Sequence, residues 1–141
     1  MKEHKFFIDT NIFLRVITQD EPKHAADCIS VLSKLRDGKF VAFTSPLVLA
    51  EIQWTLSKFY NFEKKDTLRA LDSILAIKNL KFVEESNFPL ALFLYARNSI
   101  KFIDCLIASY PPILHKQLPI LSYDKEFDKI DVKRLEPRDL L

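Results

Sequence analysis

The chain has 141 residues, of which 48% are hydrophobic and 12% aromatic, and its formal net charge is +2 at pH 7. These values predict a single globular domain over residues 1–141 and exclude a disordered chain. With 21 basic and 19 acidic residues, the chain has no general attraction for nucleic acid or membrane surfaces, so any attraction for phosphate must be local.

Several other classes of protein are excluded by simple patterns. No segment approaches the roughly 20 apolar residues that span a bilayer, and Asp9 and Asn11 interrupt the apolar run of a secretory leader. The single glycine, Gly38, leaves no glycine-rich loop for nucleotide phosphates. Cys28 and Cys105 each lie in an apolar helical pattern, which predicts buried, reduced thiols in a cytoplasmic protein.

Strand and helix patterns alternate along the chain. We expect strands at residues 5–8, 40–44, 80–84 and 119–124, with 132–136 as a candidate fifth, and helices at 10–15, 22–35, 45–60, 64–77, 87–98 and 102–110. Ser45 is placed to cap the helix at 45–60. In the helix at 64–77, Leu68, Leu71 and Leu75 form one apolar stripe. Pro111 ends or kinks the helix at 102–110. The alternation predicts an α/β fold, with a parallel sheet of four to five strands covered on both faces.

Two of the expected strands end in a carboxylate. Asp9 follows the buried strand within "FFIDTNIFLRV", and Asp124 ends "PILSYD". Taken alone, Asp9 is explained as the N-cap of the next helix. However, ligand sites in parallel sheets form at the carboxyl ends of the strands, so both acids are expected at the same edge.

Two further acids lie on helices. Glu51 lies off the apolar stripe formed by Leu49, Ile52, Leu56 and Phe59, and Asp104 lies within the apolar stretch "FIDCLIA". Taken alone, Asp104 fits an N-cap or a paired core acid as well as a functional role. If the four acids converge they repel one another, and a hard divalent cation, Mg²⁺ or Mn²⁺, resolves that repulsion. Such an ion with oxygen ligands favours phosphodiester hydrolysis.

Four segments together resemble the PIN-domain nucleases, and within them the VapC-type toxins of toxin–antitoxin pairs. The segments are "FFIDTNIFLRVITQDEP", "SPLVLAEIQWTLSKFY", "FIDCLIA" and "PILSYDKEFDKI", in family order across nearly the whole chain. The resemblance implies a three-layer α/β/α sandwich and an endoribonuclease that depends on Mg²⁺ or Mn²⁺ and cleaves RNA. It also implies a homodimer formed through apolar helices and a cognate antitoxin protein as partner.

The resemblance also assigns roles to residues. It places Asp9, Glu51, Asp104 and Asp124 at the catalytic site, with Asp9, Asp104 and Asp124 on the metal and Glu51 on the metal or the attacking water. Asn11 and Ser122 match supporting polar residues, Ser122 as a hydrogen-bond partner of an acid. Arg15 matches a subgroup pattern and is expected to be structural or dimer-related rather than catalytic.

Lys58 is a candidate RNA-binding residue on geometric grounds. It follows Glu51 by seven residues, which places it two turns along the same helix face, about 10 Å away. That distance suits the phosphate of a neighbouring nucleotide, although a solvated surface lysine explains the position as well.

Three other functions are compatible with parts of the pattern. A PIN nuclease of RNA processing needs no antitoxin, and a PIN-like binding module needs no catalysis, although the presence of all four acids argues against the module. A haloacid-dehalogenase-type phosphatase requires a second aspartate two residues after the first, where this chain has Asn11.

Overall fold

The computed structural model describes residues 4–141, and a five-stranded parallel sheet forms its centre. The strand order is β3-β2-β1-β4-β5, and Phe7 of β1 pairs with Phe43 of β2 on one side and Ile120 of β4 on the other. The strands are β1 (Lys5–Ile8), β2 (Val41–Thr44), β3 (Leu80–Phe82), β4 (Ile120–Leu121) and β5 (Arg134–Leu135). The predicted parallel sheet is confirmed, with the last three strands shorter than expected.

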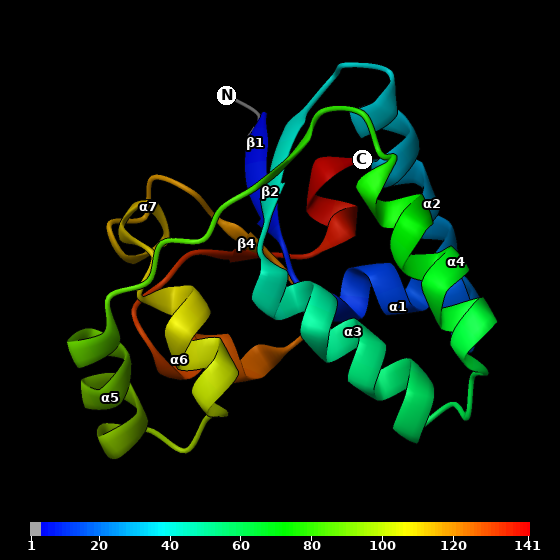
Figure 1. Ribbon diagram of the computed structural model, residues 1–141. Helices are drawn as coiled ribbons and strands as arrows, with labels where there is room; N and C mark the ends of the chain where they lie inside the picture. Colours follow the sequence, from blue (N-terminus) through cyan, green and yellow to red (C-terminus); the bar gives the residue numbers. More distant parts are fainter. Residues whose placement is uncertain (1–3) are drawn as a thin grey trace.

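Helices cover both faces of this sheet. Figure 1 shows α2 and α4 on one side of the strands and α5, α6 and α7 on the other. The helices are α1 (Thr10–Thr18), α2 (Pro22–Arg36), α3 (Pro46–Lys58), α4 (Lys64–Leu75), α5 (Phe88–Arg97), α6 (Phe102–Ala108) and α7 (Pro111–Leu114), with 3₁₀ helices η1 (Lys125–Lys129) and η2 (Pro137–Leu140). This arrangement confirms the predicted three-layer α/β/α sandwich.

Helix boundaries follow local chemistry where the sequence supplies a clear signal. Ser45 caps α3, because its Oγ accepts the backbone N–H of Leu47 at 3.1 Å. Pro111 occupies the first turn of α7, where its missing N–H costs nothing. Helix α6 ends at Ala108, before the prolines, as predicted.

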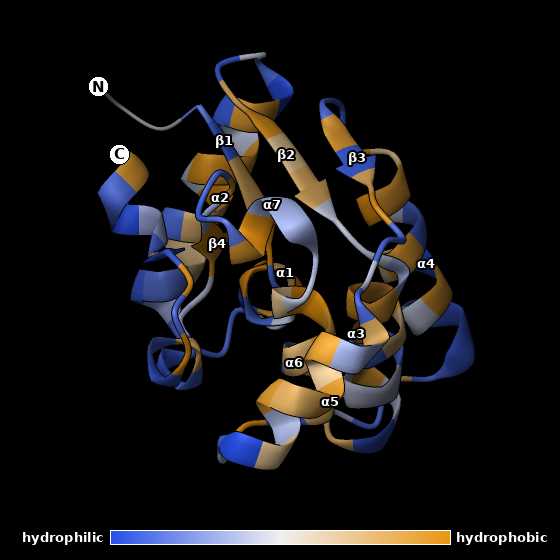
Figure 2. Ribbon diagram, turned by 90° about the vertical axis from the view of Figure 1, so that its left-hand side faces the viewer, coloured by the Kyte–Doolittle hydropathy of each residue, from blue (hydrophilic) through white to orange (hydrophobic). Residues whose placement is uncertain are grey.

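The core is built mainly on β1 and the helix that follows it. Phe6, Phe7 and Ile8 of β1 are buried, as are Ile12 and Phe13 of α1. Figure 2 shows that hydrophobic residues colour much of β1, β2 and β4 and of the helices packed near them. The polar residues between β1 and α1 are therefore embedded in the most apolar part of the molecule.

The predicted apolar stripe on α4 is wrong. Leu68 and Leu75 are exposed and Leu71 is only half-buried, whereas Thr67 and Ile74 are buried. Residues 67 and 74 share one helix face, and Leu68 and Leu75 lie about 100° round from it. Helix α4 packs against α3, and tertiary packing of this kind decides which face of a helix is buried, whatever the spacing of its leucines.

A matched pair of leucines tests this assignment of the core. Leu56 of α3 is 0% exposed, whereas Leu68 of α4 is 64% exposed. We expect Leu56→Ala to lower the free energy of unfolding by about 2–5 kcal/mol, because it removes buried methyl groups and leaves a cavity. Leu68→Ala should change it by about 0.5 kcal/mol or less. Urea denaturation of both variants measures the difference, and equal losses would contradict the observed register of α4.

Candidate active site

The carboxyl ends of β1 and β4 bring two acids to the same edge of the sheet. The strand order reverses between these neighbouring strands, since the chain builds the sheet outward from β1 to β3 and then returns to β4. Asp9 follows β1, and its backbone N–H donates to the carbonyl of Leu121 at 3.1 Å. Asp124 follows β4. The two predicted carboxylates therefore lie at a topological switch point, where α/β sheets commonly bind ligands.

The side chain of Asp9 is held by hydrogen bonds that have nothing to do with helix capping. Asp9 occupies the N-cap position of α1, but its side chain makes no capping hydrogen bond. Its Oδ2 accepts from Ser122 Oγ at 2.7 Å and from Asn11 Nδ2 at 3.1 Å. Its Oδ1 is buried and has no hydrogen-bond partner within residues 4–141. The capping explanation of this carboxylate is therefore wrong.

Asn11 and Ser122 join the ends of β1 and β4. The Nδ2 of Asn11 donates to Ser122 Oγ at 2.8 Å, and its Oδ1 accepts the backbone N–H of Tyr123 at 3.0 Å. Ser122 Oγ also accepts the backbone N–H of Asp124 at 3.0 Å. The two side chains thus fix the position of Asp9 relative to the segment that carries Asp124.

Asp104 adds a buried carboxylate from α6. Lys101 holds the N-cap position of this helix, so Asp104 is not its cap. Its Oδ2 is buried without a hydrogen-bond partner in the described chain. Burial and then the negative charge of Asp9 raise the pKa of Asp104 to about 7. Burial likewise raises the pKa of Asp9 to about 6, although the hydrogen bond from Ser122 opposes it.

Glu51 of α3 is held by two donors. Its Oε1 accepts from Thr10 Oγ1 at 2.5 Å, and its Oε2 lies 3.1 Å from Lys101 Nζ. Burial lowers the pKa of Lys101, but the nearby charges of Asp104 and Glu51 outweigh it and raise the pKa above its ordinary value. Sequence reasoning missed Lys101 and Thr10. Their adjacency to the motifs of Asp104 and Asp9 was the one available signal.

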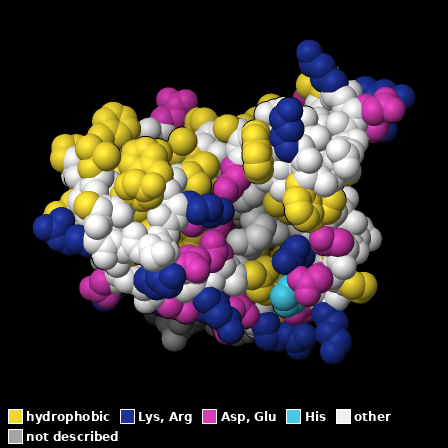
Figure 3. Space-filling model, turned by 90° about the horizontal axis from the view of Figure 1, so that it is seen from below, with side chains coloured by type: hydrophobic (Ala, Val, Ile, Leu, Met, Phe, Trp, Pro, Cys, Tyr) yellow, Lys and Arg dark blue, Asp and Glu magenta, His cyan; other side chains and the backbone are white. Residues whose placement is uncertain are grey.

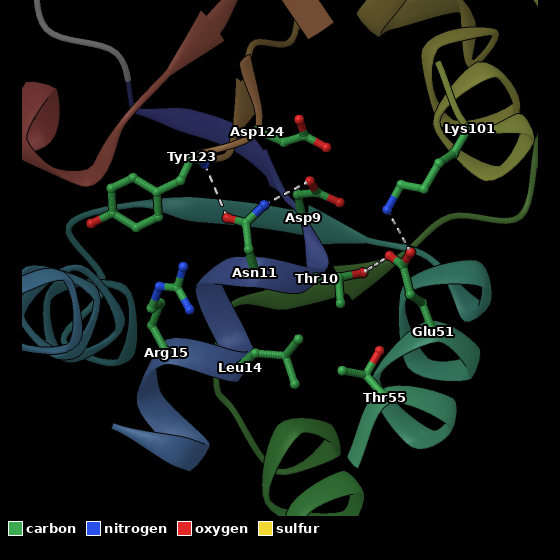
Figure 4. Close-up of a pocket in the computed structure, with 10 residues that line it drawn as sticks. All are labelled: Asp9, Thr10, Asn11, Leu14, Arg15, Glu51, Thr55, Lys101, Tyr123 and Asp124. Carbon is green, nitrogen blue, oxygen red and sulfur yellow. Dashed lines mark hydrogen bonds and ion pairs between the residues drawn. The ribbon is translucent and has the colours of Figure 1, made fainter. Parts of the chain in front are cut away.

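These side chains surround a cavity of about 320 Å³. Asp9, Glu51 and Asp124 line it together with Lys101 and Arg15, and Figure 4 shows their side chains around one space. Figure 3, seen from below the sheet, shows acidic side chains gathered in a hollow of the surface. Three predicted residues lie outside this lining. Asp104 and Ser122 are buried, and Lys58 lies further along α3.

The cation Arg15 lines the cavity but is engaged elsewhere. Its guanidinium lies 3.4 Å from a carboxylate oxygen of Asp20 and 2.9 Å from one of Glu21. Tyr60 also donates to Asp20, at 2.7 Å. These contacts join the end of α1 to the start of α2 and to the segment after α3. Arg15 therefore has the contacts of a structural residue.

The donor set suits a hard divalent cation. Asp9 Oδ1 and Asp104 Oδ2 are buried without a hydrogen-bond partner among residues 4–141, and carboxylate oxygens are the ligands that Mg²⁺ and Mn²⁺ prefer. Residues 4–141 nevertheless contain no group of three or more His, Cys, Asp or Glu side chains already arranged to hold a metal. Glu51 is held by Thr10 and Lys101, and Asp124 Oδ1 accepts the backbone N–H of Glu126 at 2.9 Å. The acids are therefore suited to a cation without forming a finished cage.

The raised pKa of Asp104 has a measurable consequence for stability. The folded chain keeps this proton up to about pH 7, whereas the ordinary pKa is 3.8, so the folded state binds more protons between these values. The metal-free protein should therefore lose stability as pH rises through this window. We expect Asp104→Asn to stabilise the metal-free chain by an amount that grows from about pH 4 to about pH 7.

Thermal unfolding in the presence of a chelator measures this effect across the pH range. Asp72→Asn, an exposed position on α4, is the control and should follow the wild type. A stability difference between Asp104→Asn and wild type that is the same at every pH would contradict the burial and charge crowding described here.

Comparisons with known proteins agree with this fold and site. The family model described as PIN domain matches residues 6–133. No curated protein matches the chain. Among similar solved structures, VapBC2 from Rickettsia felis, bound to a promoter DNA fragment, has a TM-score of 0.68 and 25% identity, and the match covers 94% of this chain and 97% of that chain. The sarcin–ricin loop cleaving toxin VapC20 from Mycobacterium tuberculosis has a TM-score of 0.69 and 16% identity, with 94% of this chain and 99% of that chain covered. PAE2754 from Pyrobaculum aerophilum has a TM-score of 0.66 and 14% identity, with 96% of this chain and 91% of that chain covered.

The last two similarities, at these identities, concern the fold alone. The family match covers most of the chain and includes all four acidic segments in full, with Asp9, Glu51, Asp104 and Asp124 inside it. The family predicted from the sequence is thus confirmed, and the chain belongs to the PIN domain family.

Proposed function

We propose that this protein is an endoribonuclease, dependent on Mg²⁺ or Mn²⁺, that hydrolyses RNA phosphodiester bonds as the toxin of a type II toxin–antitoxin pair. One observation carries the proposal: Asp9 and Asp104 each bury a carboxylate oxygen without a partner, beside a cavity that Glu51 and Asp124 also line. Membership of the PIN family and the likeness to VapBC2, a pair of that kind by its name, support the same activity.

Each acid has a role that follows from its surroundings. Asp9, Asp104 and Asp124 would hold the ion, and the ion supplies polarisation of a phosphoryl oxygen and acidification of a bound water. Glu51 faces the cavity with its carboxylate oriented by Thr10 and Lys101, so it is placed to accept a hydrogen bond from the attacking water. Attack by that water would leave a 5′-phosphate and a 3′-hydroxyl.

The supporting residues act by holding this arrangement in place. Ser122 and Asn11 donate to the same oxygen of Asp9, which leaves the other oxygen facing the site. Lys58, outside the cavity on α3, remains a proposed contact for the phosphate of a neighbouring nucleotide.

The surface offers apolar area for the proposed homodimer and antitoxin. Exposed large hydrophobic side chains occur on α5, including Phe88, Leu92 and Phe93, and at the end of α3, where Trp54 and Phe59 are exposed. Figure 3 shows a broad hydrophobic patch next to the hollowed face. Patches of this kind mark protein–protein contacts more often than free surface.

The proposed location is the cytoplasm. Cys28 and Cys105 are both buried and free, which suits a reducing compartment. Within residues 4–141, no helix combines the length and the hydrophobicity needed to cross a bilayer. The neighbouring open reading frame separates the toxin from the alternative of a PIN nuclease in RNA processing, since a small antitoxin gene beside this one favours the toxin.

Asp9→Asn tests catalysis directly. The amide keeps the size of the side chain and an oxygen that can still accept from Ser122, but it removes a metal-binding charge. We expect RNA cleavage in Mg²⁺ or Mn²⁺ to be abolished while the circular dichroism spectrum and cooperative unfolding persist. Asp72→Asn is the matched control and should cleave like wild type. Full activity in Asp9→Asn would restrict Asp9 to a structural role and favour the non-catalytic binding module.

Metal binding is tested separately from cleavage. Mg²⁺ or Mn²⁺ should raise the melting temperature of the wild type, because a ligand that binds only the folded state adds about 2.7 kcal/mol at 100 times its Kd. Asp104→Asn or Asp124→Asn should remove this shift, and Asp72→Asn should keep it. The same metal-induced shift in all four proteins would place the ion elsewhere.

A further inference from the structure

Lys101 lies where two cavities of the molecule meet. It lines the acidic cavity described above and also a second cavity of about 900 Å³ between the start of α6 and η1. The second cavity is lined by Tyr95 and Asn98 at the end of α5, by Phe102 of α6 and by Glu126 of η1. A single-stranded nucleic acid that leaves the acidic cavity past Lys101 would therefore enter a second space large enough for a nucleotide.

Of the two cations at the acidic cavity, Lys101 is the one placed to accept a new anion. The side chain of Arg15 is 23% exposed and is paired with Asp20 and Glu21. The side chain of Lys101 is 61% exposed and is paired with Glu51. An ammonium group has three donors, so a phosphate oxygen can bind Lys101 without leaving Glu51 buried and uncompensated.

The second cavity offers surfaces that suit a nucleobase. The rings of Tyr95 and Phe102 lie 5.5 Å apart at 75°, and both side chains are well exposed. The one acid of the lining, Glu126, is paired with Lys129, which also donates to the carbonyl of Ser99 at 3.2 Å. The groove therefore combines aromatic faces with an acid that is already paired, and it adjoins the exposed ammonium group of Lys101.

We propose that Lys101 binds the phosphate next to the scissile one and directs a single-stranded RNA into the second cavity, where the flanking base packs against Tyr95 and Phe102. This inference rests on the proposed ribonuclease function and adds a substrate subsite to it. A local cation followed by aromatic faces is the combination with which proteins bind single-stranded nucleic acid. It also explains how a chain of nearly neutral charge attracts a polyanion to a cluster of acids.

The test measures the Kd of a single-stranded RNA oligonucleotide against salt concentration in the Asp9→Asn background. Lys101→Met removes the charge at nearly constant length, and it should weaken binding and reduce the salt slope by about 0.7, as loss of one single-strand phosphate contact does. Lys101→Arg should retain most of the slope. Lys39→Met, at the opposite end of the sheet, is the matched control and should bind like the parent.

A second arm tests the aromatic contact. Tyr95→Ala should weaken binding by about fivefold or more at an unchanged salt slope, because stacking carries no charge, and Tyr95→Phe should restore the affinity. Thermal unfolding of each variant confirms that the comparison is between folded proteins.

The outcomes separate the subsite from the activity. If wild type cleaves RNA but Lys101→Met leaves both Kd and slope unchanged, the subsite is overturned and the ribonuclease function stands. If the chain neither binds nor cleaves RNA with Mg²⁺ or Mn²⁺, the ribonuclease function and the subsite are both overturned. If Tyr95→Ala dissociates a dimer and leaves RNA affinity intact, the groove is an interface between copies of the chain, and the subsite is overturned.

Discussion

The burial of uncompensated carboxylates at one edge of a parallel sheet is the constraint on which the rest of this site depends. Asp9 and Asp104 each keep an oxygen that no group within residues 4–141 satisfies, and burial raises the pKa of both, with the charge of Asp9 raising that of Asp104 further. Such groups cost stability, so they persist only where the surrounding fold is strong enough to impose them. Here that support comes from β1 and α1, whose apolar side chains form the most deeply buried part of the molecule.

The polar residues around these acids divide into two groups with different tasks. Asn11 and Ser122 satisfy one side of Asp9 and link it to the segment that carries Asp124, so the spacing of two acids from separate strands is fixed. Thr10 and Lys101 donate to Glu51 and hold its carboxylate at the cavity. The first group lies where charge is buried, and the second lies where the cavity is lined by an exposed cation.

The sequence predicts the parts of the site that follow from backbone topology. Strands alternating with helices require a parallel sheet, and a parallel sheet brings the residues after β1 and β4 together, so Asp9 and Asp124 were predictable. The end of α6 before Pro111 follows from proline chemistry. The buried face of α4 was not predictable, because tertiary packing buries Thr67 and leaves Leu68 exposed. Lys101 was missed for a similar reason, since only the approach of α6 to α3 places its ammonium group beside a glutamate.

The pairing of Lys101 with Glu51 also affects how a metal ion and a phosphate would share the neutralisation of the carboxylates. The side chain of Lys101 is 61% exposed, so an incoming anion can reach its ammonium group while one donor stays on Glu51. While the cation position among the acids is empty, the lysine is the nearest compensation for Glu51 and Asp104. Under the proposed function, a divalent ion held by the carboxylates would weaken the attraction between the ammonium group and Glu51, and the lysine would become more available to a phosphate. Metal and RNA would then bind with positive coupling, because each would remove the charge imbalance that disfavours the other.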